Sequence, residues 1–422
     1  MNARPRRERP QPTGRGTAIG AFGLIAFGVG LLLHRTDAFL IGLLLILVVA
    51  GSLLSLLLPG PQLTAHRMIR PDAVNAGEDA GVAVVVRSAD GRAIPLHRWR
   101  DAVPASLATD GLGEAQPLPG EPDAAVLRYR IHAAGRGRYE IGPLRVARTD
   151  PLGLAMTELV LGGPEVLLVR PRVTELADSP LDESAVGGAD LVVMRRTTPA
   201  VDEVSARDYE RGDPLRRVNW HASAKRGRLM VRLEEQRAAP QSRLLLDTIG
   251  RQGDRNAEAF ELGIELAASI GVHAIERGFA LGVVETGSPQ LDGDESGSAA
   301  AGFTGAAGGR LLVAQLAEIA PSAPTPGAIT AFGDELRRAG SDTPGFAILV
   351  GAPTATWAEL GGLHVLADPA VAFLLTPEAA AARADLERSG WVCVDVAPGT
   401  DPAAAWAAAG EAVSRRIGTG RV

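Results

Sequence analysis

Two long apolar runs near the start of the chain constrain its fold more than any other feature. Residues 17–33 carry no charged side chain over 17 positions, and residues 38–58 carry none over 21. At about 1.5 Å per helical residue the runs extend roughly 25 and 31 Å, close to the ~30 Å hydrocarbon core of a bilayer. Only four residues separate the runs. The sequence therefore predicts a transmembrane helical hairpin over residues 17–58.

The charges beside the hairpin predict its orientation. Five arginines precede the first run and two follow the second, whereas the turn between them carries one arginine beside an aspartate. By the positive-inside rule, both ends of the hairpin face the cytoplasm. We therefore expect a two-pass protein of the cell membrane, with a basic cytoplasmic N-terminus over residues 1–16 and cytoplasmic soluble domains. A cleaved signal peptide is disfavoured, because the first run lacks a small-residue cleavage site.

Residues 62–173 have the pattern of an all-β domain. Short runs rich in valine, leucine and isoleucine, at residues 80–87, 125–133 and 165–171, alternate with stretches rich in glycine and proline. Because no helical periodicity lies between these runs, they favour a small antiparallel sandwich. Its place directly after the hairpin indicates a spacer between the bilayer and the next domain.

Residues 174–241 are expected to form a polar connection, and residues 242–417 an α/β domain. Continuous apolar strands, such as residues 243–247, alternate there with helical patterns. That alternation predicts a mainly parallel sheet with helices on both faces. A stretch rich in glycine, serine and alanine at residues 288–310 predicts a flexible insertion.

Asp247 ends the first strand of this domain, at the edge where such sheets bind ligands. The von Willebrand factor type A fold places a metal there through Asp-x-Ser-x-Ser, because hard oxygen ligands suit magnesium-like ions. Here Ile249 and Arg251 occupy the two serine positions. We therefore expect Asp247 to cap the next turn and expect no cofactor. A metal-dependent ligand-binding protein or enzyme using Asp247 is the alternative.

Other patterns of chemistry are absent from the sequence. It contains no phosphate-binding Gly-x-x-x-x-Gly-Lys loop, no nucleophile elbow and no histidine pair at metal-ligand spacing. The single cysteine, Cys393, excludes an intrachain disulfide and agrees with a reducing compartment. The chain is therefore expected not to be an enzyme.

Residues 205–236 form a basic segment in an acidic protein. Eight basic and five acidic residues occur there, in a chain whose formal charge is −6, and Tyr209 and Trp220 lie among them. A nucleic-acid surface is disfavoured, because acids are interspersed and the chain is acidic overall. The alternatives are an internal ion-pair network and a protein-docking surface. We expect a combination, in which the acids order the arginines, Trp220 packs inward and the remaining surface docks a protein.

The same segment resembles the signature of the domain-of-unknown-function 58 (DUF58) family of bacterial membrane-anchored proteins. The matching residues, without a gap, are Arg207, Tyr209, Gly212, Asp213, Arg216, Val218, Trp220, Ser223, Ala224 and Lys225. The resemblance continues through residues 136–154 and the apolar start of the chain. Residues after 242 are similar to the type A domain often found in this family, without the metal-site serines.

The resemblance implies a partner rather than a reaction. Members of the family are commonly encoded beside MoxR-type AAA+ ATPases and other membrane proteins, so the resemblance implies a membrane-anchored adaptor or scaffold. A MoxR-type AAA+ ATPase is the expected partner, with membrane proteins of the same operon beside it. Arg216 and Lys225 would supply charge to the docking surface, and Tyr209 and Trp220 would be its rigid anchors.

Overall fold

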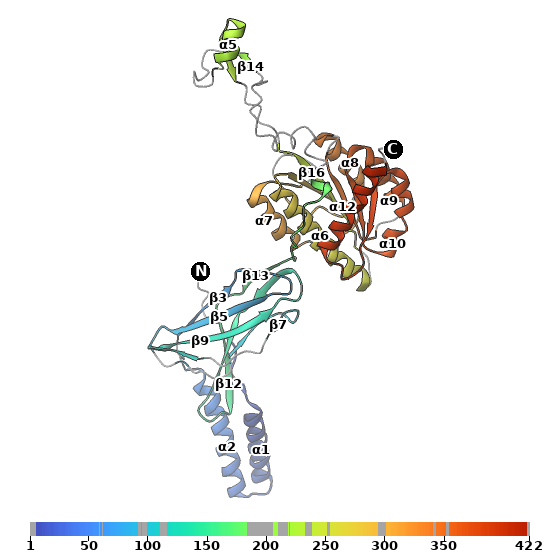
Figure 1. Ribbon diagram of the computed structural model, residues 1–422. Coiled ribbons are helices and arrows are strands. Elements are labelled where there is room, and N and C mark those ends of the chain that lie inside the picture. The colour runs from blue at the N-terminus through green and yellow to red at the C-terminus, as the bar shows by residue number, and fades with distance from the viewer. Residues whose placement is uncertain are drawn as a thin grey trace. The chain divides into compact units, whose positions relative to one another are not determined.

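The computed structural model describes most of the chain as two compact units, shown in Figure 1. One unit is Met1–Arg172 with Leu316–Glu318, and the other is Val173–Gln315 with Ile319–Val422. The described residues are 6–58, 60, 62–91, 94, 99–109, 116–183, 206–209, 218, 220–232, 239–250, 254–293, 301–340, 343–351 and 354–419.

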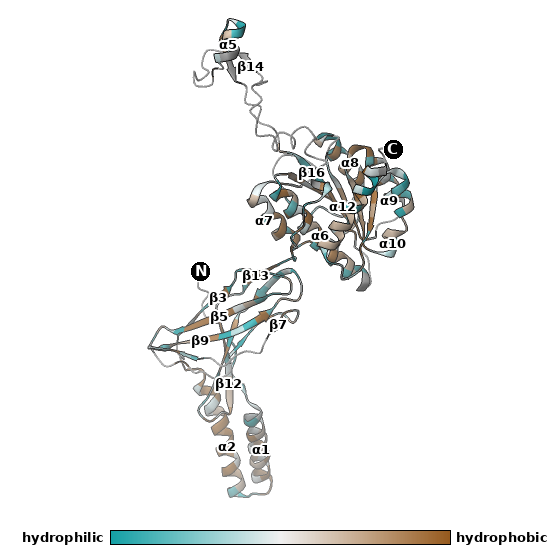
Figure 2. Ribbon diagram, in the orientation of Figure 1, coloured by the Kyte–Doolittle hydropathy of each residue, from teal (hydrophilic) through white to brown (hydrophobic). Residues whose placement is uncertain are grey.

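The apolar start of the chain forms two helices, α1 (Gly14–Leu32) and α2 (Thr36–Ser55). Both are long and apolar enough to cross a membrane, and Figure 2 shows the apolar character of α2. The helices pack closely, because a side chain at Gly30 or Gly42 would overlap the backbone of the opposite helix. The predicted pair of apolar helices is confirmed, although each begins and ends one to three residues earlier than expected.

The residues before α1 join the β domain. Strands β1 (Arg6–Arg7) and β2 (Gln11–Pro12) both pair antiparallel with β12 (Ala155–Leu161). The pairing adds strands that the sequence analysis did not predict within the basic stretch at residues 1–16. Strands of two residues are too short to show a periodicity in the sequence, so they cannot be predicted from it. Since α2 leads directly into the same domain, both ends of the helical pair attach to it.

The described part of residues 62–173 is all β, and its strands form three sheets around one apolar core. The first sheet contains β3 (Leu63–Arg70), β5 (Asp79–Ser88), β9 (Glu121–His132), β7 (Ala108–Thr109) and β8 (Gln116–Leu118). The second joins β1, β2 and β12 to β11 (Leu144–Thr149) and β6 (Trp99–Asp101). The third contains β10 (Gly137–Ile141), β13 (Glu165–Arg170) and β4 (Ala73–Asn75). The described pairs are antiparallel apart from β4 with β13.

A buried ion pair links two of these sheets. Arg67 of β3 donates to both carboxylate oxygens of Asp101 of β6, at 2.5 and 3.0 Å. The Tyr129 hydroxyl of β9 donates to Asp101 at 2.6 Å, and Arg67 also donates to the Gly163 carbonyl at 3.1 Å. Burial, followed by the contact with Asp101, raises the pKa of Tyr129. Because the charges are paired and hydrogen-bonded, they can occupy the core of the sandwich.

We expect Asp101→Ala to destabilise the β domain by about 3–5 kcal/mol, because Arg67 would remain buried without a counter-charge. Denaturant unfolding of the full chain in detergent, followed by the fluorescence of Trp99 after the other four tryptophans are replaced by phenylalanine, measures this change. Asp72→Ala, at an exposed position, is the control. An equal effect of the two substitutions would contradict a structural role for the pair.

The second unit contains a six-stranded sheet in the order β18-β17-β16-β19-β20-β21. Its strands are β16 (Gln241–Leu246), β17 (Ala280–Glu285), β18 (Ala301–Phe303), β19 (Gly345–Leu349), β20 (Ala370–Leu374) and β21 (Val392–Asp395). Only β18 runs antiparallel to its neighbour within this sheet. The predicted mainly parallel sheet is therefore confirmed.

Helices cover both faces of this sheet. Besides the short α3 (Pro180–Glu183) in the connecting segment and α5 (Trp220–Arg226), which is treated below, the described helices of this unit are α6 (Asp254–Glu276), α7 (Gly305–Leu316), α8 (Ala328–Ala339), α9 (Thr354–Gly361), α10 (Pro377–Ala380), α11 (Arg383–Ser389) and α12 (Pro402–Thr419), with a 3-10 turn at Gly362–Leu366. Successive residues of strand β19 point to opposite faces of the sheet. Ala347 and Leu349 of β19 share a core with α8 and α9, whereas Ile348 lies against Gly263 of α6.

Two expectations for this unit need correction. The predicted flexible insertion at residues 288–310 contains strand β18 and the first turns of α7, which starts at Gly305. The glycine and alanine in this stretch give no sequence pattern for β18 or the first turns of α7, because these elements gain their stability from packing on the sheet. Helix α8 was missing from the prediction. A buried ion pair, Arg243 Nε to Glu335 Oε2 at 3.3 Å, ties α8 to β16.

Candidate functional site

Asp247 lies at the point where the order of the sheet reverses. It follows β16, and the neighbouring strands are β17 on one side and β19 on the other. In open α/β sheets this position is the usual place for a ligand. Its side chain is 1% exposed, so any chemistry at Asp247 depends on what its carboxylate already contacts.

The Asp247 carboxylate is fully occupied by protein donors. Oδ2 accepts from the backbone N–H groups of Val350 at 3.0 Å and Gly351 at 2.9 Å, just after β19. Oδ1 accepts from the Thr286 hydroxyl at 2.7 Å, just after β17, and from the Ile249 N–H at 3.4 Å. One carboxylate thus joins the ends of three adjacent strands. The predicted turn cap is confirmed, and its reach is wider than one turn.

This arrangement gives a divalent cation little to bind. The groups that face Asp247 are mostly N–H donors, whereas magnesium and calcium need oxygen ligands. Among the described residues, no three His, Cys, Asp or Glu side chains are grouped to hold a metal ion. Arg251, at the second serine position of the type A pattern, lies outside the described residues.

We expect Asp247→Ala to destabilise the α/β domain, because each buried donor left without an acceptor costs about 1–3 kcal/mol. Asp247→Asn should cost less, since its amide oxygen can still accept from one set of donors. Near-ultraviolet circular dichroism during thermal unfolding measures the melting temperatures of the two variants and the wild type. Adding Mg²⁺ tests the alternative interpretation: a rise in the melting temperature of the wild type that is lost in Asp247→Asn would favour a metal site.

Glu285, which the sequence did not single out, lies at the end of the neighbouring strand β17. It is buried, and its Oε2 accepts from the backbone N–H groups of Gln290 at 2.7 Å and Leu291 at 2.9 Å. Its Oε1 is buried without a hydrogen-bond partner among the described residues. Burial raises the pKa of Glu285, and the two N–H groups offset part of that rise. The carboxyl group orders the start of the stretch that was predicted to be flexible.

The raised pKa of Glu285 makes stability depend on pH. Because the folded chain holds this proton more tightly than the unfolded chain, the contribution is complete below the ordinary glutamate pKa of about 4.3. It is lost as the pH rises through the folded-state value. Glu285→Gln should therefore flatten the fall in melting temperature as the pH rises above about 4.3, relative to the exposed control Glu359→Gln. An unchanged slope would contradict this role.

The described part of residues 206–232 forms a small element of its own, here called the signature element. Strands β14 (Ala206–Asp208) and β15 (Met230–Arg232) pair antiparallel, and helix α5 (Trp220–Arg226) precedes β15. The Ser223 hydroxyl accepts from the Met230 N–H at 2.8 Å, and the Tyr209 N–H donates to the Leu229 carbonyl at 2.9 Å. Ser223 therefore holds α5 against the strand pair.

Some side chains of this element are buried and others are exposed. Val218 and Met230 are buried, whereas Trp220 is 67% exposed and Lys225 is exposed. The expectation that Trp220 packs inward is therefore wrong, because the smaller side chains fill the interior and Trp220 is the first residue of a short helix. Ala224 is also exposed, and Tyr209 is half-buried.

Part of the predicted site lies outside what the structure describes. This holds for Gly212, Asp213 and Arg216, and for the side chain of Arg207, whose backbone belongs to β14. The acidic side chains expected to order the arginines lie outside it too. The ion-pair network within this segment stays a prediction.

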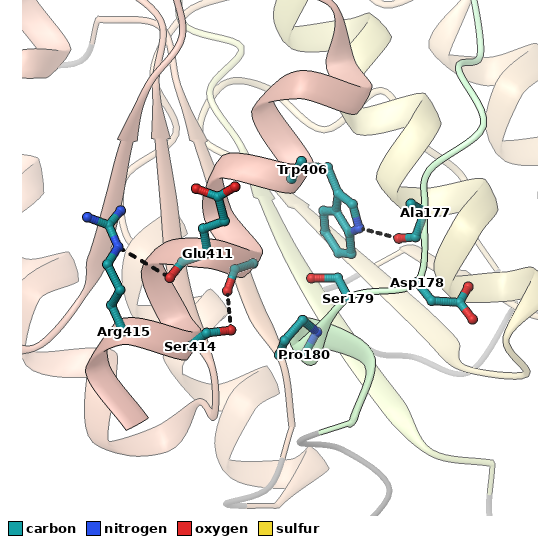
Figure 3. Close-up of a pocket in the computed structure, with 10 residues that line it drawn as sticks. Ala177, Asp178, Ser179, Pro180, Trp406, Glu411, Ser414 and Arg415 are labelled. Atoms are coloured by element: carbon teal, nitrogen blue, oxygen red, sulfur yellow. Dashed lines mark hydrogen bonds between the residues drawn. The ribbon is translucent and has the colours of Figure 1, made fainter. Parts of the chain in front are cut away.

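A hollow of about 480 Å³ lies in the second unit between residues 177–180 and α12. Figure 3 shows the Trp406 indole directed at Ala177, whose carbonyl it meets at 3.0 Å. Asp178 forms an ion pair with Arg277 of the same unit. The absence of a side chain at Gly410 lets Ser179 approach α12. These contacts fix the connecting segment to the α/β domain, so we interpret the hollow as a packing seam.

Comparison with known proteins identifies the region around the signature element. Residues 205–343 match the family described as "Protein of unknown function DUF58". Residues 205–343 are thus similar to this family and are here called the DUF58 region. This match confirms the resemblance drawn from the signature residues, and it extends from β14 through β18 and α8 to just before β19. The DUF58 region thus includes both the signature element and Asp247.

A curated relative supports the same assignment at a distance. The chain is 25% identical over 247 residues to "Uncharacterized protein YeaD" of Bacillus subtilis (strain 168), covering 55% of this chain and 59% of the relative. The chain therefore spans about three fifths of that relative's length. Neither description names an activity, so function has to be argued from the surface.

Proposed function

We propose that this DUF58 protein is a membrane-anchored adaptor that docks a cytoplasmic protein through its signature element. The observation that carries the proposal is Trp220, a large aromatic side chain left 67% exposed on an ordered element. Tryptophan, tyrosine and arginine are the residues that most often dominate binding energy at interfaces. On the same element, Lys225 adds exposed charge and Leu229 adds exposed apolar surface.

The order of the element supports docking. Ser223 and the β14–β15 pairing hold α5 in place, so Trp220 is presented on a scaffold whose ordering costs little at binding. Docking a folded partner is favoured over nucleic acid, because the acidic residues among the arginines weaken phosphate binding.

Membrane anchoring through α1 and α2 is the second part of the proposal. Apolar side chains such as Leu24 and Leu47 are exposed along these helices, and water would not favour that surface. Both ends of the pair attach to one domain, which fits an even number of crossings. The flanking arginines favour a cytoplasmic side for that domain.

The fold and the partner complete the proposal. The sheet order, with one antiparallel edge strand and Asp247 at the reversal point, supports a von Willebrand factor type A-like domain whose metal position has become a hydrogen-bonded cap. We propose a MoxR-type AAA+ ATPase as the partner, on the strength of the DUF58 resemblance. The adaptor would hold this ATPase at the membrane surface.

We expect the paired substitution Trp220→Ala with Lys225→Ala to weaken binding of a MoxR-type ATPase at least ten-fold, which is about 1.4 kcal/mol. Titration of the purified ATPase onto the full chain in nanodiscs measures the affinity. The matched control, Val365→Ala with Arg388→Ala, removes an exposed apolar and an exposed basic side chain elsewhere. Equal affinity of folded Trp220→Ala/Lys225→Ala and wild type would overturn the docking proposal.

A further inference from the structure

The two helices have almost no length to spare for crossing a bilayer. Helix α1 has 19 residues and α2 has 20, which correspond to about 28 and 30 Å against a hydrocarbon core of ~30 Å. If they span, the first turn of α1 must lie at the boundary between headgroups and acyl chains. Any group fixed beside that turn lies at the same depth.

A turn of the β domain, residues 150–154, is fixed beside the first turn of α1. The Thr13 N–H donates to the Leu154 carbonyl at 2.9 Å, and the Thr13 hydroxyl donates to the Gly153 carbonyl at 2.8 Å. Gly16 lies so close to the Leu154 carbonyl that a side chain there would overlap it. The turn therefore cannot move away from the helix without breaking these contacts.

The turn is itself rigid, and it presents an apolar side chain. Asp150 Oδ1 accepts from the Ala155 N–H at 2.7 Å and Oδ2 from the Leu152 N–H at 2.9 Å, while Gly153 adopts a φ of +70°. These bonds hold the chain in a tight loop whose apex is Leu152. Leu152 is 64% exposed, although it belongs to a domain with a well-filled core.

Basic side chains accompany Leu152 at this end of the domain. Arg15 is exposed in the first turn of α1, and Arg148 donates to the Leu58 carbonyl, just beyond α2, at 3.3 Å. An apolar apex flanked by arginines is the combination that favours the headgroup region, where acyl chains and anionic phosphates meet. In water the apolar leucine side chain would be exposed at a cost in free energy. In a protein interior the arginines would be buried without counter-charges.

We propose that Leu152 inserts into the headgroup–acyl boundary of the bilayer, so that the β domain rests on the membrane through this turn as well as through its helices. The inference depends on the proposed membrane anchoring and adds a third point of attachment to it. Two helices allow the domain to rock about their axis, whereas a third contact off that axis fixes its orientation.

Spin labelling of the full chain tests the inference. A nitroxide on Leu152→Cys, in vesicles of phosphatidylcholine and phosphatidylglycerol, is compared with labels on Leu24→Cys in α1 and Val166→Cys in β13. Leu24 and Val166 are 63% and 41% exposed. Strand β12 separates the turn from β13 by about 20 Å at ~3.3 Å per residue. Native Cys393 is buried, which raises the pKa of its thiol to about 12, so the wild-type chain serves as a weakly labelled blank.

Collisions with lipid-soluble oxygen should exceed those with a water-soluble nickel chelate at positions 152 and 24, and the reverse should hold at position 166. If position 24 is in lipid but position 152 reports water, the turn does not insert and the inference is overturned while the anchor stands. If position 24 also reports water, membrane anchoring fails and the inference fails with it.

Discussion

Strand β12 carries the attachment on which the arrangement of the first unit depends. It pairs with β1 and β2 from the residues before α1, and with β11 inside the β domain. The chain therefore leaves the domain, forms α1 and α2, and returns to the same domain at β3. Backbone hydrogen bonds rather than a flexible tether thus set where the helices begin. The contacts of Thr13 and Gly16 with residues 153–154 follow from that pairing.

In the second unit, carboxylates at strand ends organise loops. Asp247 gathers donors from the ends of β17 and β19, and Glu285 orders the backbone that follows β17. Both side chains occupy positions where α/β proteins often place catalytic or metal-binding groups. Here their oxygens are largely taken by backbone N–H groups and a threonine hydroxyl. The DUF58 region of this chain thus uses the ligand-binding edge of its sheet for internal order.

The signature element divides its characteristic residues between scaffold and surface. Ser223 bonds to the backbone of β15, and Val218 and Met230 fill the interior. Trp220 and Lys225 are left outside. The same motif therefore contains residues that stabilise a small fold and residues that remain available for binding. The exposed residues, Trp220 and Lys225, are the ones that another protein could contact.

The apolar helices, the all-β domain and the mainly parallel sheet can be predicted from the sequence, because each follows from local periodicity and length. The sequence also placed Asp247 at a strand end. The pairing of β1 and β2 with β12, the order within residues 301–310 and the burial of Glu285 are fixed only by tertiary contacts. Those features depend on contacts between segments distant in sequence, which local pattern does not encode. The outward position of Trp220 belongs with them, since it was decided by which side chains filled the small interior.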